Sequence, residues 1–234
     1  MIPLGVISSS SLSAFSLPPL GLVGHWDASK FSNFTPVNTW TDQTGLGDMV
    51  VPSGAYGFDA RVPSFGGSTS LQGYYIVPKT GGKLHRSMPP SDPSYGGENY
   101  YWSVVVVWNP GTNEVFGVDQ VSLRQEGQVI NITDGVDQSS HSNSSSFAST
   151  FIVTSSNGGK DVFRNGTLLR HFTAASPLNL GSSRLTLGGS AFYDTSLSLS
   201  RTSSKYFEVA LYNRTLTTSE VSSIHSYAKA KWSL

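Results

Sequence analysis

The sequence predicts an all-β protein: a sandwich of two antiparallel sheets that carries one C-terminal helix. Short apolar or alternating segments recur along the chain, and clusters of Gly, Pro, Asn and Ser separate them. Hydrophobic residues make up 38% of the 234 residues and include five Trp, ten Tyr and twelve Phe, which is enough for a substantial core. Only the segment from residue 217 onward has helical spacing. Because all-β sandwiches of this length are commonly single units, we expect one folded domain.

The expected strands are short, and the most buried of them lies in YYWSVVVVWNPG. Its Val and Trp residues fall on both faces of a strand, so both faces should be covered. In FRNGTLL, the pair Asn165-Gly166 favours a two-residue type I′ hairpin turn. Residues 80–97, which contain paired Gly and Pro, and the polar residues 134–146 are expected to be loops. The expected strands are residues 22–28, a segment starting at 35, and residues 74–77, 102–108, 115–124, 128–133, 148–155, 161–172, 185–187 and 206–212.

The C-terminal helix has a complete start signal. Thr217 and Glu220 form a Thr-x-x-Glu capping box, and Leu216 and Val221 occupy the two positions of a hydrophobic staple. The helix should therefore start at Thr218. Its narrow apolar stripe needs a sheet or loop to cover it, and consists of Val221, Ile224, Tyr227 and Ala228.

The composition excludes several classes of partner. Fifteen basic and fifteen acidic residues cancel, and only 13% of residues are charged, so the sequence lacks the basic surface that nucleic-acid or polybasic membrane binding requires. No apolar run approaches the roughly 18 residues of a membrane span. The chain has no Cys, which excludes disulfides, thiolate metal sites and a Cys nucleophile. We therefore expect neither nucleic acid nor a membrane as a partner.

Several segments resemble one superfamily. VGHWDASKF and VNTWTDQTGLGDMV resemble its Trp-x-Asp-Ala pattern and the Trp-x-Asp-x-Ser/Thr-Gly-x-Gly turn that follows. RVPSFGG, DVFRNGTLLR, LTLGGS and the terminal EVALYNRTLTTSEVSSIHSYAKAKW are similar to its later elements. The family is the LamG and concanavalin A-like lectin/glucanase superfamily, in a laminin-G-like form common in bacterial and phage proteins. The resemblance implies a concanavalin A-like jelly-roll sandwich over residues 22–234, with the first and last strands adjacent, and leaves residues 1–21 as a separate arm.

The residues give no catalytic site. Catalytic jelly rolls of this superfamily usually carry Glu-x-Asp-x-x-Glu on one strand, and the five Glu residues here are isolated, so we expect no enzyme. The five His residues are too widely spread to suggest zinc. Calcium is the one metal left open, because Asp134 and Asp137 share a polar loop and Asp42 and Asp48 flank a Gly-rich turn. Solvated turn aspartates are the alternative interpretation, and no other cofactor is expected.

Glycan binding would use aromatic faces on loops. The candidate residues are Tyr95, Tyr100 and Tyr193, with Tyr101 and Phe192 beside them in the sequence. Core or rim packing is the alternative for these rings. The remaining aromatic residues of note lie in strand-like segments and are expected in the core: Trp26, Trp40, Trp102 and Trp108.

The functional hypothesis is based on the arm. Its large apolar residues stand among Ser, Gly and Pro without any charge, so the arm would be unstable if it were exposed to water. We expect a non-enzymatic structural protein of a phage virion surface, in which the arm docks on a capsid or tail lattice as a capsid decoration, head fibre or tail-associated protein. Its partners would be other virion proteins and copies of itself, with a host surface glycan as a further ligand. The alternative is a glycan-binding receptor-recognition or adhesion module. The arm residues are Ile2, Leu4, Ile7, Leu12, Phe15 and Leu17.

Overall fold

A computed structural model gives the architecture. It describes residues 16–31, 35–51, 58–61, 75–78, 84–87, 101–109, 115–118, 121–126, 128–134, 137–142, 148–173, 184–188, 204–232 and 234. These residues form two antiparallel sheets, packed face to face, and one C-terminal α-helix. The expected all-β sandwich with a terminal helix is confirmed.

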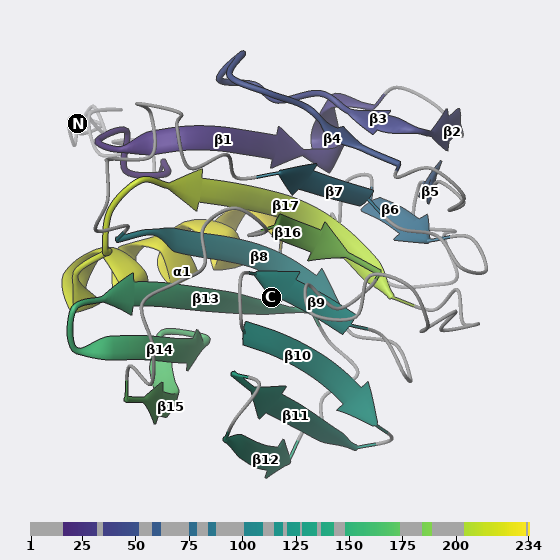
Figure 1. Ribbon diagram of the computed structural model, residues 1–234. Coiled ribbons are helices and arrows are strands. Elements are labelled where there is room, and N and C mark those ends of the chain that lie inside the picture. The colour runs from purple at the N-terminus through teal and green to yellow at the C-terminus, as the bar shows by residue number, and fades with distance from the viewer. Residues whose placement is uncertain are drawn as a thin grey trace, which may run out of the picture.

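The first sheet is the larger one and includes both the first and the last strand (Figure 1). Strand β1 (Leu22–Asp27) pairs with β17 (Lys205–Tyr212) along its length, from Leu22 opposite Tyr212 to Asp27 opposite Glu208. The neighbouring first and last strands agree with the implied jelly roll. In spatial order the sheet contains β15 (Thr167–Phe172), β14 (Gly159–Arg164), β13 (Ser149–Ser156), β8 (Ser103–Asn109), β17 (Lys205–Tyr212), β6 (Tyr75–Pro78), β5 (Phe58–Arg61) and β2 (Thr35–Val37), with β1 (Leu22–Asp27) paired to β17.

The second sheet packs against the inner face of the first. Its antiparallel strands β9 (Val115–Val118) and β10 (Val121–Glu126) occupy a segment where the sequence predicted one strand, 115–124. Residues 119–120 lie outside the described residues. In spatial order this sheet contains β12 (Gln138–Ser142), β11 (Val129–Thr133), β10 (Val121–Glu126), β9 (Val115–Val118), β16 (Arg184–Leu187), β7 (Leu84–Ser87), β4 (Met49–Val50) and β3 (Thr39–Trp40).

The core between the sheets is built from large aromatic and branched side chains. Trp108 on β8 lies 5.4 Å from Phe151 and 6.0 Å from Tyr206, measured between ring centroids. Such ring contacts add to the hydrophobic gain of burying the rings. All four Trp residues expected in the core are buried there: Trp26, Trp40, Trp102 and Trp108.

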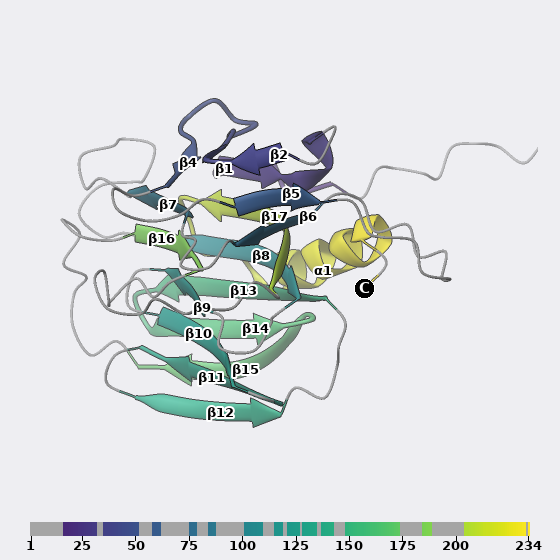
Figure 2. The same cartoon turned by 90° about the vertical axis from the view of Figure 1, so that its right-hand side faces the viewer.

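A third layer covers the outer face of the first sheet. Helix α1 (Thr218–Trp232) lies along this face, so the described chain has the order second sheet, first sheet, helix (Figure 2). Val105 and Val107 of β8 face the helix, while Val104 and Val106 face the second sheet. Strand β8 is therefore covered on both faces, as its apolar sequence predicted.

The helix begins as expected. The Thr217 backbone N–H donates to Glu220 Oε2 at 2.9 Å, and the Glu220 N–H donates to Thr217 Oγ1 at 3.3 Å, which is the reciprocal capping box. Leu216 and Val221 are buried in one cluster against the sheet. The start of the helix at Thr218 is confirmed, and its buried stripe also includes Trp232.

Two expected loops contain strands. Strand β12 lies within 134–146 and pairs with β11, although its sequence QSSHS has no apolar residue. It is the edge strand of the second sheet, and none of its residues is buried, so neither of its faces needs large apolar side chains. Strand β7 lies within 80–97 and pairs with β16, with Leu84 buried in the core. Backbone pairing has overridden the local turn signals in both places.

The Asn165-Gly166 turn is confirmed. It joins β14 to β15 with Arg164 opposite Thr167. Asn165 has φ 51° and Gly166 has φ 80°, the two positive values that a type I′ turn requires. A short 3-10 helix, η1 (Ala28–Lys30), follows β1.

Candidate functional site

Polar side chains gather at several places in the described chain. These include a buried cluster under α1, an anchored loop at residues 42–48, the turn between β11 and β12, and the outer face of the second sheet.

The buried cluster joins the first strand, the last strand and the helix. Glu208 on β17 is 1% exposed, and its Oε1 accepts hydrogen bonds from His25 Nε2 at 2.7 Å and from Tyr227 OH at 2.7 Å. Lys231 Nζ also donates to Oε1 at 2.9 Å, and Trp232 Nε1 donates to Oε2 at 2.7 Å. Every carboxylate oxygen of this buried side chain is thus satisfied.

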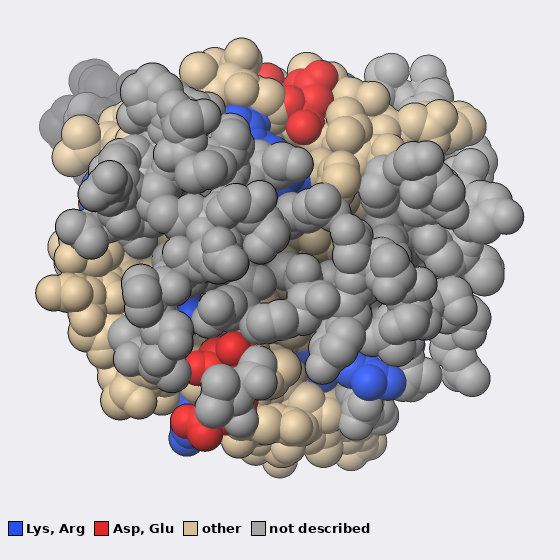
Figure 3. Space-filling model, viewed as in Figure 1, with Lys and Arg blue, Asp and Glu red and all other residues tan. Residues whose placement is uncertain are grey.

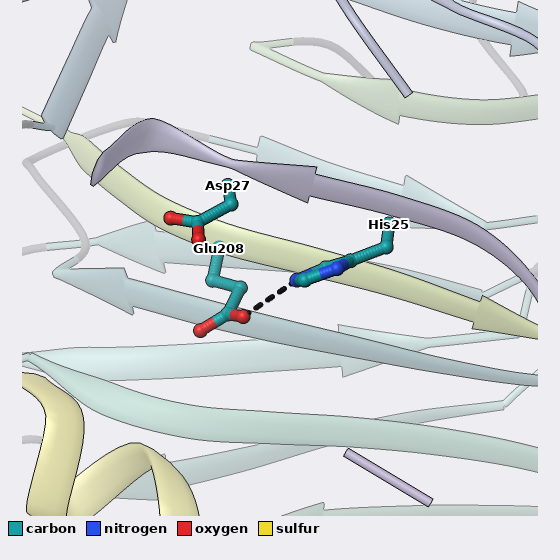
Figure 4. A group of neighbouring side chains, drawn as sticks. All are labelled: His25, Asp27 and Glu208. Atoms are coloured by element: carbon teal, nitrogen blue, oxygen red, sulfur yellow. Dashed lines mark hydrogen bonds and ion pairs between the residues drawn. The ribbon is translucent and has the colours of Figure 1, made fainter. Parts of the chain in front are cut away.

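Asp27 completes this cluster from β1. Its Oδ2 accepts from Lys231 Nζ at 2.9 Å, and its Oδ1 accepts from the Ser29 N–H at 2.8 Å, which caps η1. Figure 4 shows His25, Asp27 and Glu208 close together, with the imidazole pointing at the Glu208 carboxylate. We call the set the latch cluster: His25, Asp27, Glu208, Tyr227, Lys231 and Trp232.

The electrostatics of the latch cluster favour two ionised carboxylates. Burial alone would raise the pKa of Glu208, but the His25 hydrogen bond, the Lys231 charge and the Tyr227 and Trp232 hydrogen bonds lower it overall. Burial opposes ionisation of Asp27 too, yet Ser29 and Lys231 hold its pKa below the ordinary value. Glycoside hydrolysis requires one carboxyl group that stays protonated as a general acid. These two carboxyl groups do not meet that requirement.

Three residues of the latch cluster have the spacing of metal ligands, but Lys231 already supplies a positive charge between them. One ligand atom each from His25, Asp27 and Glu208 lies within 4.8 Å of the others, a spacing that could suit a metal ion. Lys231 Nζ contacts both carboxylates at 2.9 Å and so supplies a positive charge from the chain itself. The latch cluster therefore fastens α1 to the sheet.

The loop at residues 42–48 is organised by one aspartate. The Asp42 carboxylate accepts hydrogen bonds from the backbone N–H groups of His25, Thr44, Leu46 and Gly47 and from the Thr44 hydroxyl. Burial would raise its pKa, but these hydrogen bonds lower it overall. Arg86, which donates to the carbonyls of Leu46 and Gly47, lies 3.6 Å from Asp42 Oδ2. Asp42 is therefore a buried structural residue, and the alternative of a solvated turn aspartate is wrong for it.

The two aspartates proposed for calcium lie at one turn, between β11 and β12. Asp134 Oδ1 accepts from the Asp137 N–H at 2.8 Å, and the Asp134 N–H donates to the Asp137 carbonyl at 3.2 Å. Asp137 Oδ2 lies 3.8 Å from Arg170 Nη2 on β15 of the other sheet. The structure brings the two residues together, with one carboxylate closing the turn and the other facing a cation. Calcium binding at this turn stays a prediction.

The outer face of the second sheet carries two rows of polar residues. The pairing registers place them side by side across the strands, opposite to the core-facing Leu and Ile side chains. The first row is Gln138, Thr133, Ser122, Thr186 and His85, with Gly117 between Ser122 and Thr186. The second row is Ser140, Asn131 and Arg124. We call these rows the polar face.

The polar face is most exposed near its edge. Gln138 and Ser140 on β12 are exposed, and Thr133 and Asn131 on β11 are partly exposed, whereas Ser122 is only 6% exposed. Ser140 Oγ donates to Asn131 Oδ1 at 2.7 Å, which orients that amide. Figure 3 shows the charged residues of one side of the molecule in a few separate groups. The exposed and partly exposed residues of the polar face on β11 and β12 offer hydroxyl and amide groups.

Most of the other predicted site residues fall outside the described part of the chain. This applies to Tyr95, Tyr100 and Tyr193, and also to Ile2, Leu4, Ile7, Leu12 and Phe15 of the arm. Leu17 is described and is 9% exposed, packed in the layer between the first sheet and α1. The last part of the arm thus lies against the chain's own sandwich. Leu20 is 73% exposed, and its carbonyl accepts from Arg214 Nε.

Sequence reasoning missed the latch cluster. A signal was present in the last strand, KYFEVALY, where Glu208 is the one acidic residue of a mostly apolar segment. A carboxylate buried in such a strand needs hydrogen-bond or charged partners, which His25 and Lys231 supply.

Comparisons with known proteins support the fold. No protein-family model matches the chain, and no curated protein matches it in sequence. Among solved structures, a Trypanosoma rangeli sialidase in complex with sialic acid matches with a TM-score of 0.64 and 16% identity, over 92% of this chain and 34% of the sialidase. A mutant of that sialidase with trans-sialidase activity matches with a TM-score of 0.65 and 19% identity, over 92% of this chain and 34% of the mutant. The botulinum neurotoxin serotype D binding domain matches with a TM-score of 0.57 and 9% identity, over 88% of this chain and 50% of that structure.

These likenesses show a β-sandwich compatible with the expected concanavalin A-like jelly roll. At such identities they show the fold alone, because one sandwich hosts many functions. The chain spans about a third of the sialidases and about half of the toxin structure. Within the described residues, no helix has the length and hydropathy that a membrane crossing needs.

Proposed function

We propose that the chain is a non-enzymatic recognition module that binds glycans, and that the exposed edge of the polar face is its binding surface. The observation that carries this proposal is the pair of polar rows on a regular sheet. Sugars present many hydroxyl groups, which hydrogen-bond to hydroxyl and amide side chains such as those of Asn131, Thr133, Gln138 and Ser140. A sheet holds these groups in fixed positions, which lowers the entropy cost of binding.

The similar structures support this choice of ligand class. One of them is a sialidase in complex with sialic acid. The non-catalytic part of the proposal is supported by the geometry of the latch cluster, where Lys231 Nζ donates to both Asp27 and Glu208 at 2.9 Å and ties the two carboxylates to α1.

A glycan array tests the proposal, with the best hit then titrated against variants. Thr133→Ala combined with Gln138→Ala should weaken binding, since each lost hydrogen bond contributes about 1 kcal/mol. The matched control is Ser222→Ala combined with Ser226→Ala, which removes exposed hydroxyls from the solvent side of α1. An array without hits, or a hit that the Thr133 and Gln138 changes leave intact, would contradict the proposal.

We further propose that this module is displayed on a virion surface, in the laminin-G-like form and of phage origin suggested by the sequence. The support is the uncharged apolar arm, of which the described end packs on the sandwich at Leu17 and reaches solvent at Leu20. Residues before Leu17 would then contact other capsid or tail proteins, or copies of this chain. Arm deletion tests this placement independently of glycan binding.

A further inference from the structure

The chain contains two Asn-Gly pairs, and both form two-residue turns. Asn157-Gly158 joins β13 to β14, with Ser156 opposite Gly159, and Asn165-Gly166 joins β14 to β15. Asn-Gly is the pair in which the backbone nitrogen of Gly most readily attacks the preceding side-chain amide, because Gly adds no steric hindrance. The structure therefore places one reactive dipeptide in two different environments.

The Asn165 side chain is held away from this reaction. Its Oδ1 accepts from the Thr150 N–H at 2.9 Å, and its Nδ2 lies 3.5 Å from Ser149 Oγ. Both contacts join the turn to β13, so the amide would have to leave them before its carbonyl carbon could meet the Gly166 nitrogen. A reaction needs its atoms in an attacking geometry, and this side chain is fixed in another one.

Asn157 is in the opposite situation. Both Asn157 and Gly158 are exposed, and within the described chain the Asn157 side chain has no hydrogen-bond partner. A Cβ built on Gly158 would meet only Ser156 Oγ within 4 Å, at 3.7 Å, so the space beside the attacking nitrogen is open. The Gly158 N–H donates to Ser156 Oγ at 3.2 Å, which places an oxygen at the proton that the reaction removes.

We propose that Asn157-Gly158 is a site of spontaneous modification, in which Asn157 converts to isoaspartate and aspartate through a succinimide. The Gly158 nitrogen forms a bond to Asn157 Cγ, the Cγ–Nδ2 bond breaks, and the leaving amide takes the Gly158 proton and departs as ammonia. Water then opens the ring. Attack at the main-chain carbonyl gives isoaspartate, and attack at Cγ gives aspartate, so the process consumes one water and requires no oxidant or enzyme.

The product changes the hairpin in two ways. Each product adds a negative charge at the turn, and isoaspartate also adds one backbone carbon to a turn that has room for two residues. The β13–β14 register begins at the adjacent pair Ser156 and Gly159. The Ser155 carbonyl accepts from Thr215 Oγ1 at 2.5 Å, so the segment leading to α1 lies close to the modified turn.

Peptide mapping by mass spectrometry tests the proposal on the full chain, incubated folded in mildly alkaline buffer and, in parallel, unfolded in urea. In the folded protein Asn157 should convert at least about tenfold faster than Asn165, because only Asn157 can reach the attacking geometry. In urea the two should convert at similar rates. Gly158→Ala should slow conversion at Asn157 and leave Asn165 unchanged, and Asn157→Gln should abolish the product there. Equal rates at both sites in the folded protein, or conversion of Asn157 only in urea, would overturn the proposal.

Discussion

Glu208 is the residue on which the attachment of the helix depends. Replacing it with Gln keeps the size of the side chain but leaves Lys231 without one of its two carboxylate partners. Breaking a buried ion pair on one side costs about 3–5 kcal/mol when the other charge is left buried and unpaired. Because Lys231 keeps Asp27 and its side chain is 24% exposed, we expect Glu208→Gln to lower the free energy of unfolding by less than this range, measured by urea denaturation.

The chain offers a matched control for this change. His171 Nδ1 lies 2.7 Å from Asp161 Oδ1, the same distance as in the His25–Glu208 pair, but both side chains are substantially exposed. Because exposed pairs contribute about 0–1 kcal/mol, Asp161→Asn should change stability little. Equal effects of the two substitutions would show that burial of Glu208 is not what makes it important.

The two latch carboxylates also predict how stability depends on pH. Their folded pKa values lie below the ordinary values of 4.5 for Glu208 and 3.8 for Asp27. A lowered folded pKa stabilises the protein above the unfolded pKa, and this stabilisation is lost as the pH falls through the folded value. In the wild type, we expect the urea concentration at the unfolding midpoint to decrease as the pH is lowered below 4.5. The decrease should be smaller in Glu208→Gln, and identical pH profiles of the two proteins would contradict this account.

At the scale of elements, the capping box sets where α1 begins. Thr217→Ala removes the hydroxyl that accepts from the Glu220 N–H, and loss of such a cap costs about 1 kcal/mol. The control Ser226→Ala removes a hydroxyl from the middle of the same helix, where it donates to the Ser222 carbonyl and caps nothing. Thermal denaturation should therefore separate the two variants, with a clearly lower Tm for Thr217→Ala only.

The elements also show what sequence can predict here. The helix start, the Asn165-Gly166 turn and β8 follow from residues close together in the chain, so local patterns identified them. Strand β12 could not be found in this way, because its stability comes from pairing with β11 and its side chains carry no apolar signal. The latch cluster was missed for a related reason: His25 and Glu208 are 183 positions apart, and only the fold brings them together.

At the scale of the whole molecule, the end of the arm is part of the folded sandwich, whereas the sequence predicted a separate arm. Leu17 packs in the layer under α1, so deleting residues 1–20 should destabilise the sandwich by roughly 2 kcal/mol, at the lower end of the cost of removing a buried Leu. Deleting residues 1–15 should leave the Tm nearly unchanged while abolishing incorporation into particles or oligomers. If the shorter deletion still assembles normally, the arm is not the docking segment and the virion proposal fails in this form.

The pairing of β1 with β17 has a consequence for how the protein is made. The last strand lies between β8 and β1 in the first sheet, so this sheet has a gap in its middle until residue 212 is available. Bringing the first strand to the last closes a loop of most of the chain, and contacts of such long sequence separation fold slowly. During synthesis the apolar inner strands therefore stay exposed until β17 is available. We expect the first sheet to close only after residue 212 has left the ribosome, and this interval is when aggregation is the main hazard.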